Sequence, residues 1–173
     1  MAWLIVVFVL APAVLSEAAP AGERKGFVIG VGAGFGRTDW GVNHSGLFTN
    51  FKIGYAPTEQ SMILWQSSGT FFKGTDGDWK MDGIGGAAVQ VYVSKKRGRS
   101  GCAIAGVGYH NVIRMRFSDS GVGGSNSIGL GIRGGFGYEF APHWTIEALV
   151  HHGFNAREHN PTSVGVSLNV IWP

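Results

Sequence analysis

The sequence predicts an all-β protein, an eight-stranded antiparallel up-and-down transmembrane β-barrel. Three observations lead to this prediction. The N-terminal segment has the features of an export signal, eight stretches alternate between apolar and polar or glycine residues, and the connections between them alternate between short and long. Only 14% of the residues are charged and 29 are glycine, a composition that disfavours both a soluble α/β enzyme and a disordered chain.

The N-terminal segment resembles a secretory signal peptide. Residues 4–14 form an apolar run, and small residues after it supply the small-x-small pattern that signal peptidase recognises. A membrane-spanning helix needs about 20 consecutive apolar residues, whereas this run contains Pro12 and is soon followed by Glu17. We therefore expect residues 1–21 to be a signal peptide and residues 22–173 to form one barrel domain.

Cysteine and charge content narrow the possible functions. Cys102 is the single cysteine of the chain, so an internal disulfide and a multi-cysteine metal cluster are excluded. The net charge of +3 arises from the basic residues within residues 95–99. Basic residues mixed with glycine and serine, without aromatic stacking partners, are typical of a solvated turn. We expect no nucleic-acid partner, no cofactor and no metal ion.

The first four expected strands show an alternation of period two, the spacing of side chains on one face of a strand. In the first strand, Phe27, Ile29 and Val31 alternate with small residues. The second strand alternates aromatic and aliphatic residues with more polar ones, the third is less regular, and the fourth alternates alanine and valine with more polar residues. These strands are expected at residues 27–36, 47–55, 61–72 and 79–94.

The last four expected strands follow the same period. In the fifth, alanine, valine and tyrosine alternate with glycine and His110, and in the sixth a fully apolar side opposes glycines, Arg133 and Glu139. The seventh places Glu147 and His151 opposite aliphatic residues, and the eighth alternates aliphatic residues with serine, glycine and asparagine. These strands are expected at residues 102–113, 126–140, 145–151 and 163–172.

The connections between these strands alternate between compact and extended. Short turns at one end and long loops at the other are typical of a transmembrane barrel. We expect the long loops, especially residues 38–45 and 114–125, to carry any recognition by the protein. Compact turns are expected at residues 56–60, 95–101 and 141–144, and longer polar loops at residues 38–45, 73–78, 114–125 and 155–162.

The alternation by itself does not say which face lies inside the barrel. A soluble ligand-carrying barrel turns its apolar face inward, whereas the export signal and the lack of a second apolar layer favour an apolar face turned toward lipid. The interior of an eight-stranded barrel holds only side chains, so charges inside must pair with one another. We expect an interior charge cluster in which Lys52 and Arg133 meet Glu139 and Glu147.

Aromatic residues near the ends of the expected strands fit the two membrane interfaces, where an amphipathic ring is stabilised at headgroup depth. Two belts of such rings would bracket the hydrocarbon layer. The residues expected to form them are Tyr55, Trp65, Trp79, Trp144 and Trp172.

The segment GFGYEFAPHWTIEAL, residues 135–149, resembles the small outer-membrane β-barrel families typified by the OmpA membrane domain and by opacity-type and OmpX-type proteins. As a pattern, the resemblance covers the whole expected barrel. It implies a porin-like, monomeric eight-stranded barrel in the cell outer membrane of a Gram-negative bacterium, with structural, adhesive or surface-binding loops. The implied partners are outer-membrane lipid, lipopolysaccharide and the barrel assembly machinery, which recognises a C-terminal strand with an aromatic such as Trp172.

Two other functions remain as alternatives. Lipid A deacylases are also eight-stranded barrels with a His-x-Ser-Asn motif, but residues 152–155 carry Phe154 at the serine position, which removes the nucleophile. A soluble exported barrel that binds a small ligand is the second alternative. The histidines His151, His152 and His159 do not suggest a metal site, because adjacent strand residues point to opposite faces. We expect a non-enzymatic outer-membrane barrel without catalytic residues or a large pore.

Overall fold

The computed structural model describes residues 24–39, 42–118, 121–154 and 160–172, so the expected signal peptide at residues 1–21 lies outside the described residues. Within these ranges every regular element is a β-strand. Among the same residues, no helix has the length and apolar character needed to cross a membrane. The strands are β1 (Gly26–Asp39), β2 (Asn43–Thr58), β3 (Ser61–Lys73), β4 (Trp79–Tyr92), β5 (Ser100–Ser118), β6 (Gly121–Ala141), β7 (Trp144–Phe154) and β8 (Thr162–Trp172).

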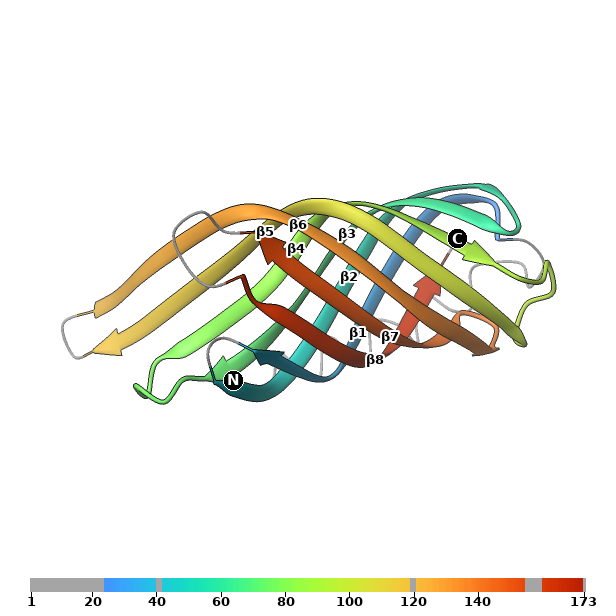
Figure 1. Ribbon diagram of the computed structural model, residues 1–173. Coiled ribbons are helices and arrows are strands. Elements are labelled where there is room, and N and C mark those ends of the chain that lie inside the picture. The colour runs from blue at the N-terminus through green and yellow to red at the C-terminus, as the bar shows by residue number, and fades with distance from the viewer. Residues whose placement is uncertain (1–23, 40–41, 119–120, 155–159, 173) are drawn as a thin grey trace.

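The eight strands form a closed antiparallel barrel. Each strand pairs with its neighbour in the sequence, and β1 closes the ring by pairing with β8 from Ile29 opposite Trp172 to Asp39 opposite Thr162. Figure 1 shows the tilted strands wrapping around one lumen, with the β5 and β6 hairpin extending past its neighbours at one end. The predicted fold class, an eight-stranded up-and-down barrel, is confirmed.

The two ends of the barrel differ in their connections. The turn end carries the connections after β2, β4 and β6, and the loop end carries those after β1, β3, β5 and β7. At the turn end the pairing register shifts between Tyr55 and Thr58 and again between Glu139 and Ala141. Such bulges increase the local twist where a strand leaves the wall. His143 has a φ of 71°, a left-handed conformation that lets the β6–β7 connection turn within two residues.

Two of the expected long loops are largely strand. β5 and β6 stay paired from Ser100 opposite Glu139 to Ser118 opposite Gly121, so most of residues 114–125 belongs to a hairpin. β1 and β2 likewise pair as far as Asp39 opposite Asn43, within the expected loop at residues 38–45. The expectation was wrong for residues 43–45 and 121–125 because period two detects only strands with one apolar face, whereas backbone pairing continues without such a face. In β5 the alternation does continue through Met115 and Phe117, but these residues were assigned to the loop.

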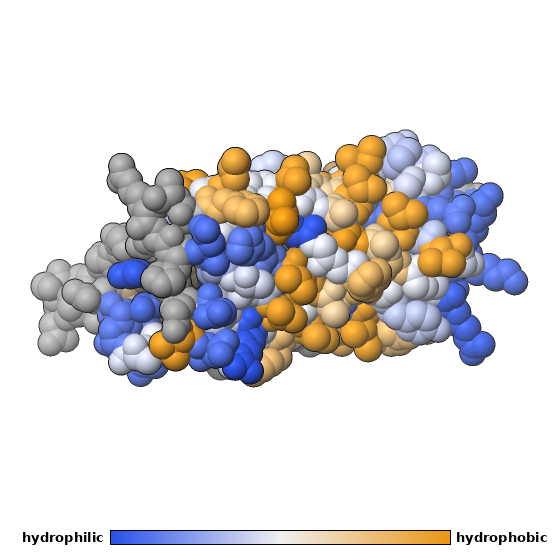
Figure 2. Space-filling model, viewed as in Figure 1, coloured by the Kyte–Doolittle hydropathy of each residue, from blue (hydrophilic) through white to orange (hydrophobic). Residues whose placement is uncertain are grey.

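The outer surface of the wall is apolar. Large hydrophobic side chains on the outer face of every strand are exposed, among them Phe35, Phe51, Leu130 and Phe136. Figure 2 shows hydrophobic residues gathered over the middle of the face in view, between more hydrophilic ends. The apolar face of the alternation is therefore the outer face, which is the opposite of what a soluble ligand-carrying barrel needs.

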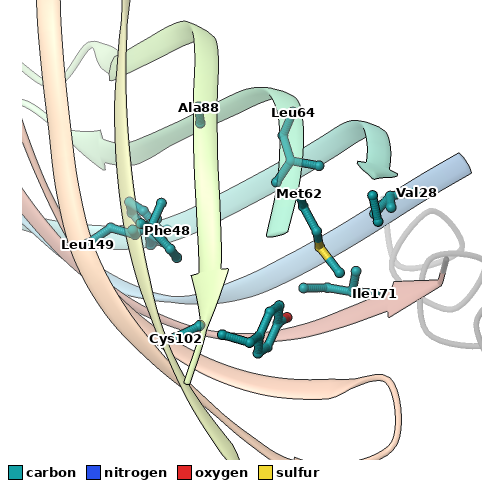
Figure 3. Close-up of a cluster of buried hydrophobic side chains, with 11 residues drawn as sticks. Val28, Phe48, Met62, Leu64, Ala88, Cys102, Leu149 and Ile171 are labelled. Carbon is teal, nitrogen blue, oxygen red and sulfur yellow. The ribbon is translucent and has the colours of Figure 1, made fainter. Parts of the chain in front are cut away.

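The lumen contains a smaller group of apolar side chains. Figure 3 shows aliphatic and sulfur-containing side chains from several strands converging inside the wall, with Met62 between Leu64 and Ile171. They fill the space that the polar groups leave and exclude water from it. The members of this cluster are Val28, Phe48, Ala56, Met62, Leu64, Ala88, Tyr92, Cys102, Ile104, Leu149 and Ile171.

Candidate functional site

The lumen is the candidate functional site because buried polar side chains gather there. In β7, Thr145, Glu147, Leu149 and His151 are buried, while the residues between them are exposed. The same alternation in the other strands directs one side chain in two into the barrel. The resulting polar groups form three layers, one at the turn end, one in the middle and one at the loop end.

The middle layer is built around an ion pair between Lys52 of β2 and Glu147 of β7. The Lys52 Nζ lies 2.5 Å from Glu147 Oε1 and also donates to Gln90 Oε1 at 2.8 Å. The amide of Asn50 donates to Glu147 Oε2 at 3.0 Å and to Asn169 Oδ1 at 2.9 Å. Each charge thus has an opposite charge and further hydrogen bonds, the condition under which buried charges are tolerated.

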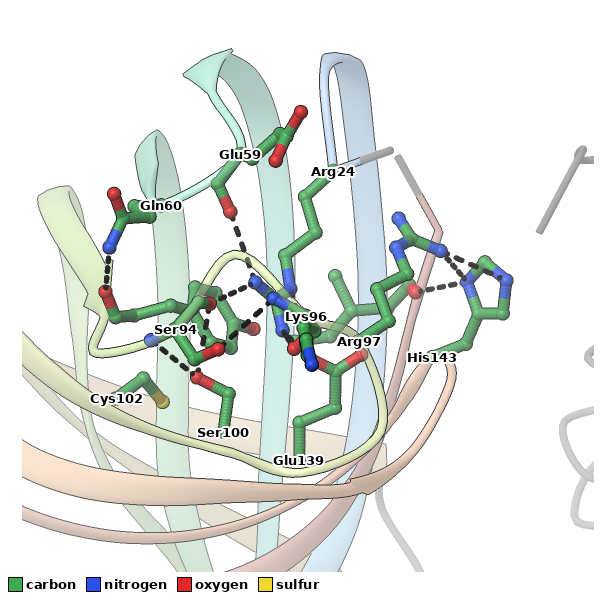
Figure 4. A network of polar contacts seen from close by, with 12 residues as sticks. Arg24, Glu59, Gln60, Ser94, Lys96, Arg97, Ser100, Cys102, Glu139 and His143 are labelled. Atoms are coloured by element: carbon green, nitrogen blue, oxygen red, sulfur yellow. Dashed lines mark hydrogen bonds and ion pairs between the residues drawn. The ribbon is translucent and has the colours of Figure 1, made fainter. Parts of the chain in front are cut away.

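The turn-end layer is organised by Arg24, which lies just before β1. Its guanidinium donates two hydrogen bonds to Glu139 Oε2 of β6, one of them at 2.9 Å, and lies 4.0 Å from the centre of the Tyr92 ring. Figure 4 shows the side chain reaching down from the start of β1 into this network. The same guanidinium also donates to the backbone carbonyls of Glu59 at 3.0 Å, Ser94 at 2.8 Å and Lys96 at 2.9 Å.

One arginine therefore ties two turns and β6 to the start of β1 and closes the turn end. Arg24 could not be identified from the alternation, because it precedes the first alternating stretch. Its only signal is its place between an expected signal peptide and an expected strand.

The four expected interior charges do not form one cluster. The structure brings Lys52 and Glu147 together, but Glu139 pairs with Arg24, and Arg133 pairs with no carboxylate among the described residues. Arg133 instead donates to the backbone carbonyls of Gln66 at 2.8 Å and Ile84 at 3.1 Å. The expectation failed because Glu139 lies six residues from Arg133 on one strand, about 20 Å along it. The alternation predicts on which side of the barrel wall a side chain lies, but not its height along the barrel axis.

The loop-end layer contains Asp82 of β4, His110 of β5 and His151 of β7. His110 Nε2 lies 2.5 Å from Asp82 Oδ1, and His151 Nε2 lies 3.6 Å from Asp82 Oδ2. Hydroxyls of Thr38 and Ser163 donate to the same Oδ2, the first at 2.7 Å. All five side chains are buried.

The loop-end residues could not be grouped from the sequence. Asp82 is an even number of residues away from Gln90 on β4, so the two side chains point to the same face, and His110 lies on the glycine side of β5. Both residues could therefore be assigned to the inner face. The sequence does not show that they lie at the same height along the barrel. His151 faces inward and His152 outward, as expected for adjacent strand residues, and His159 lies outside the described residues.

His152 lies on the outer face next to a hydroxyl that the sequence argument missed. The His152 Nδ1 and the Thr162 Oγ1 are 2.8 Å apart because these two residues are cross-strand partners in β7 and β8. In the described part of the chain no carboxylate is recorded at His152, whereas a hydrolytic triad needs a third group to orient the base. Phe154, at the serine position of the deacylase motif, is exposed on the same face.

The expected interfacial aromatics occupy different positions. Tyr55 and Trp144 lie on the outer face near the turn end, and Trp79 begins β4 at the loop end. Trp65 does not lie at a strand end, because β3 extends beyond it on both sides. Its ring centre lies 5.9 Å from that of Tyr109.

Trp172 does not have the exposed position expected of a belt residue. Register places it opposite Ile29 at the end of β8, but its side chain is only 8% exposed. It is therefore packed against protein instead of offering its ring to the surroundings.

Glycines on the inner face make room for the large polar side chains. A β-carbon on Gly153 would lie 2.4 Å from two ring atoms of His110. We expect Gly153→Ala to lower the free energy of unfolding by about 1–3 kcal/mol, because this ring would have to move in a filled lumen. Urea unfolding in lipid vesicles, followed by tryptophan fluorescence, measures the change.

Gly134→Ala is the matched control for this substitution. Its new β-carbon would meet no atom closer than 3.9 Å, so the variant should unfold at the same urea concentration as the unaltered protein or a higher one. Equal losses in both variants would show that His110 does not restrict Gly153.

Solved structures of bacterial surface proteins share this architecture. Neisserial surface protein A aligns with 84% of this chain and 95% of its own, at 15% sequence identity and a TM-score of 0.59. Ail, the attachment invasion locus protein of Yersinia pestis, aligns with 86% of this chain and 99% of its own, at 12% identity and a TM-score of 0.53. The chain has the fold of the small outer-membrane β-barrels.

A further small outer-membrane barrel extends this likeness. The outer membrane protein OprG from Pseudomonas aeruginosa aligns with 89% of this chain and 99% of its own, at 12% identity and a TM-score of 0.52. At these identities the likeness concerns the fold and does not carry over an activity. No protein-family model matches the sequence, and no curated protein matches it.

Proposed function

We propose that this chain is an integral barrel of the bacterial outer membrane, without enzymatic activity, whose filled lumen anchors a surface-binding structure at the loop end. The observation that carries the proposal is the belt of exposed hydrophobic side chains on all eight strands. Soluble monomers rarely expose continuous apolar patches of more than a few hundred Å². A transmembrane strand needs about 9–11 residues, and every strand here has at least that length.

The buried polar layers support a role other than transport through a wide pore. Ionised side chains from opposite walls meet in the lumen, as between Lys52 and Glu147, and the turn end is closed by Arg24. An eight-stranded barrel has an interior just wide enough for such side chains. The outer belt would contact outer-membrane lipid and lipopolysaccharide, and β8 would be the strand presented to the barrel assembly machinery.

The surface-binding role is assigned to the β5–β6 hairpin. Among the described residues, β5 pairs with β4 as far as Met115, and β6 pairs with β7 from Leu130 onward. Beyond these residues the pairing that the structure describes is between the two hairpin strands, which project past the wall (Figure 1). Projecting segments on a rigid scaffold are where binding residues concentrate.

Shortening the hairpin tests this role. Replacing residues 116–123 by a two-residue Asn-Gly turn should leave the barrel folded, because these residues pair only within the hairpin. Non-adherent host bacteria that display the full-length barrel should attach to plates coated with collagen as a probe surface, and those that display the shortened protein should lose most of this attachment. Heat-dependent electrophoretic mobility of the outer-membrane fraction reports on folding in each variant.

A second variant controls for general damage to the loop end. Exchange of residues 74–78 for another turn of the same length should preserve attachment, since this turn joins β3 to β4 and is not part of the β5–β6 hairpin. Attachment that survives hairpin shortening, or that the full-length barrel never confers, would contradict the surface-binding role. A protein that fractionates with the soluble periplasm would contradict the membrane location.

A further inference from the structure

We propose that Asp82, His110 and His151 form a binding site for a divalent transition metal ion of the zinc class inside the barrel. The three side chains come from β4, β5 and β7, and each is at most 1% exposed. Their potential ligand atoms all lie within 4.8 Å of one another. Two imidazoles and one carboxylate are a ligand set that zinc takes in proteins, with a fourth position left for water.

The separations between these atoms suit an ion after small side-chain movements. In a tetrahedral site with zinc bonds of about 2.0–2.2 Å, ligand atoms are about 3.3–3.5 Å apart. The His151 Nε2 already lies 3.6 Å from the Asp82 Oδ2. The His110 Nε2, at 2.5 Å from the Asp82 Oδ1, must withdraw by about 1 Å. The three residues therefore need only side-chain rotation to surround an ion.

An independent observation points to a missing partner in the same place. His151 is buried, yet in the described part of the chain neither of its ring nitrogens makes a hydrogen bond, although its Nε2 is directed at the Asp82 carboxylate. Buried polar groups in native proteins are nearly always satisfied, because leaving one unpaired costs about 1–3 kcal/mol. A metal ion between His151 and Asp82 gives this imidazole its partner.

A second buried polar group without a hydrogen bond in the described part of the chain lies beside Asp82, on the neighbouring strand β3. Thr70 is the cross-strand partner of Asp82, its side chain is fully buried, and no partner of its hydroxyl is recorded among the described residues. Two buried polar side chains for which the described residues supply no hydrogen bond thus lie beside one carboxylate. Their coincidence favours an occupant of this layer over an isolated packing irregularity.

The surroundings orient the carboxylate as an outer shell does in metal sites. Thr38 and Ser163 both donate hydrogen bonds to the Asp82 Oδ2, which holds the carboxylate in place between the histidines. Thr38 is the last but one residue of β1, and Ser163 is the second residue of β8. The site therefore lies close to the loop end of the lumen.

The ligand chemistry excludes the hard cations that are abundant at a cell surface. Ca²⁺ takes six to eight oxygen ligands and Mg²⁺ retains several waters, whereas this site offers two nitrogens and one carboxylate. Bound zinc would join β4, β5 and β7 just below the projecting hairpin. It would raise the resistance of the barrel to unfolding, since it binds the folded state alone.

Zinc titration of the purified, folded, chelator-treated protein tests the site. Competition with a chromophoric chelator should detect one equivalent of Zn²⁺ per barrel, which Ca²⁺ and Mg²⁺ do not displace. His151→Gln should weaken the affinity about tenfold or more, as loss of a ligand does. His152→Gln is the matched control, because His152 lies next in the same strand on the outer face and should leave the affinity unchanged.

Two further measurements keep the test decisive. The visible spectrum of the unaltered protein with Co²⁺ should show the intense bands of four-coordinate cobalt. This measurement does not require any variant to fold. Zn²⁺ should raise the temperature of the electrophoretic shift in the unaltered and His152→Gln proteins but not in His151→Gln. No stoichiometric zinc binding, faint six-coordinate cobalt bands, or wild-type affinity in folded His151→Gln would each overturn the proposal. None of these results depends on whether the hairpin binds a surface.

Discussion

Replacing Glu147 by leucine should lower the free energy of unfolding of the barrel by about 3–5 kcal/mol, because it leaves Lys52 as a buried charge without a counter-charge. The two side chains are 0% and 1% exposed, and their charged atoms lie 2.5 Å apart in the middle layer of the lumen. The leucine also removes the acceptor of the Asn50 amide, which donates to Glu147 Oε2 at 3.0 Å. Urea unfolding in lipid vesicles, followed by tryptophan fluorescence and by electrophoretic mobility, measures the loss.

The double variant Lys52→Met/Glu147→Leu separates the pair from the packing around it. Removing both charges restores an interior without an unpaired ion, so most of the lost stability should return. The coupling between the two substitutions then equals the difference between the double variant and the sum of the single ones. A double variant as unstable as that sum would mean that the ion pair does not determine the stability of the middle layer.

Replacing Arg24 by methionine should lower the free energy of unfolding by about 3–5 kcal/mol, because Glu139 is left as a buried carboxylate without its cation. Arg24 also donates to the carbonyls of Glu59, Ser94 and Lys96, which belong to two turns. Those turns should become mobile together in the variant. Hydrogen exchange at the turn end and urea unfolding measure the two effects.

Lysine at position 24 and alanine at position 99 are the controls for Arg24. Arg24→Lys keeps the charge but not the planar fork that contacts several acceptors, so it should retain only part of the stability. Arg99 is exposed in the β4–β5 turn, and Arg99→Ala should change the free energy of unfolding by no more than about 0.5 kcal/mol. If Arg24→Met were as mild as Arg99→Ala, the network at the turn end would not hold the barrel closed.

These predictions concern the scaffold on which the proposed surface role depends. A lumen stabilised by paired charges holds the strands in a fixed arrangement, and the hairpin projects from two of them. Variants of the lumen should therefore change stability without changing what the hairpin binds. Variants of the hairpin should do the reverse, so the two properties are separable by experiment.

The sequence by itself determined the number of strands, their alternating faces and the inward position of the four charged residues assigned to the interior, but not that of Asp82 or Arg24. Period-two alternation is a local property, because successive side chains of a strand point to opposite sides whatever the strand pairs with. Arg133 and Glu139 were assigned to the inner side on this basis, and both are buried. The same alternation did not find the start of β6, since residues 121–127 have no apolar face, and the expected loop took in the last residues of β5 although Met115 and Phe117 continue its alternation.

Only the tertiary structure decided which inner side chains meet. Height along the barrel depends on the tilt of the strands and on the register in which the sheet closes, and neither is encoded in the spacing within a strand. Glu139 and Glu147 therefore took different partners, and Asp82, His110 and His151 came together from three strands far apart in the sequence. Alternation assigns each residue to a side of the wall, but closure of the barrel sets its height and so its partners.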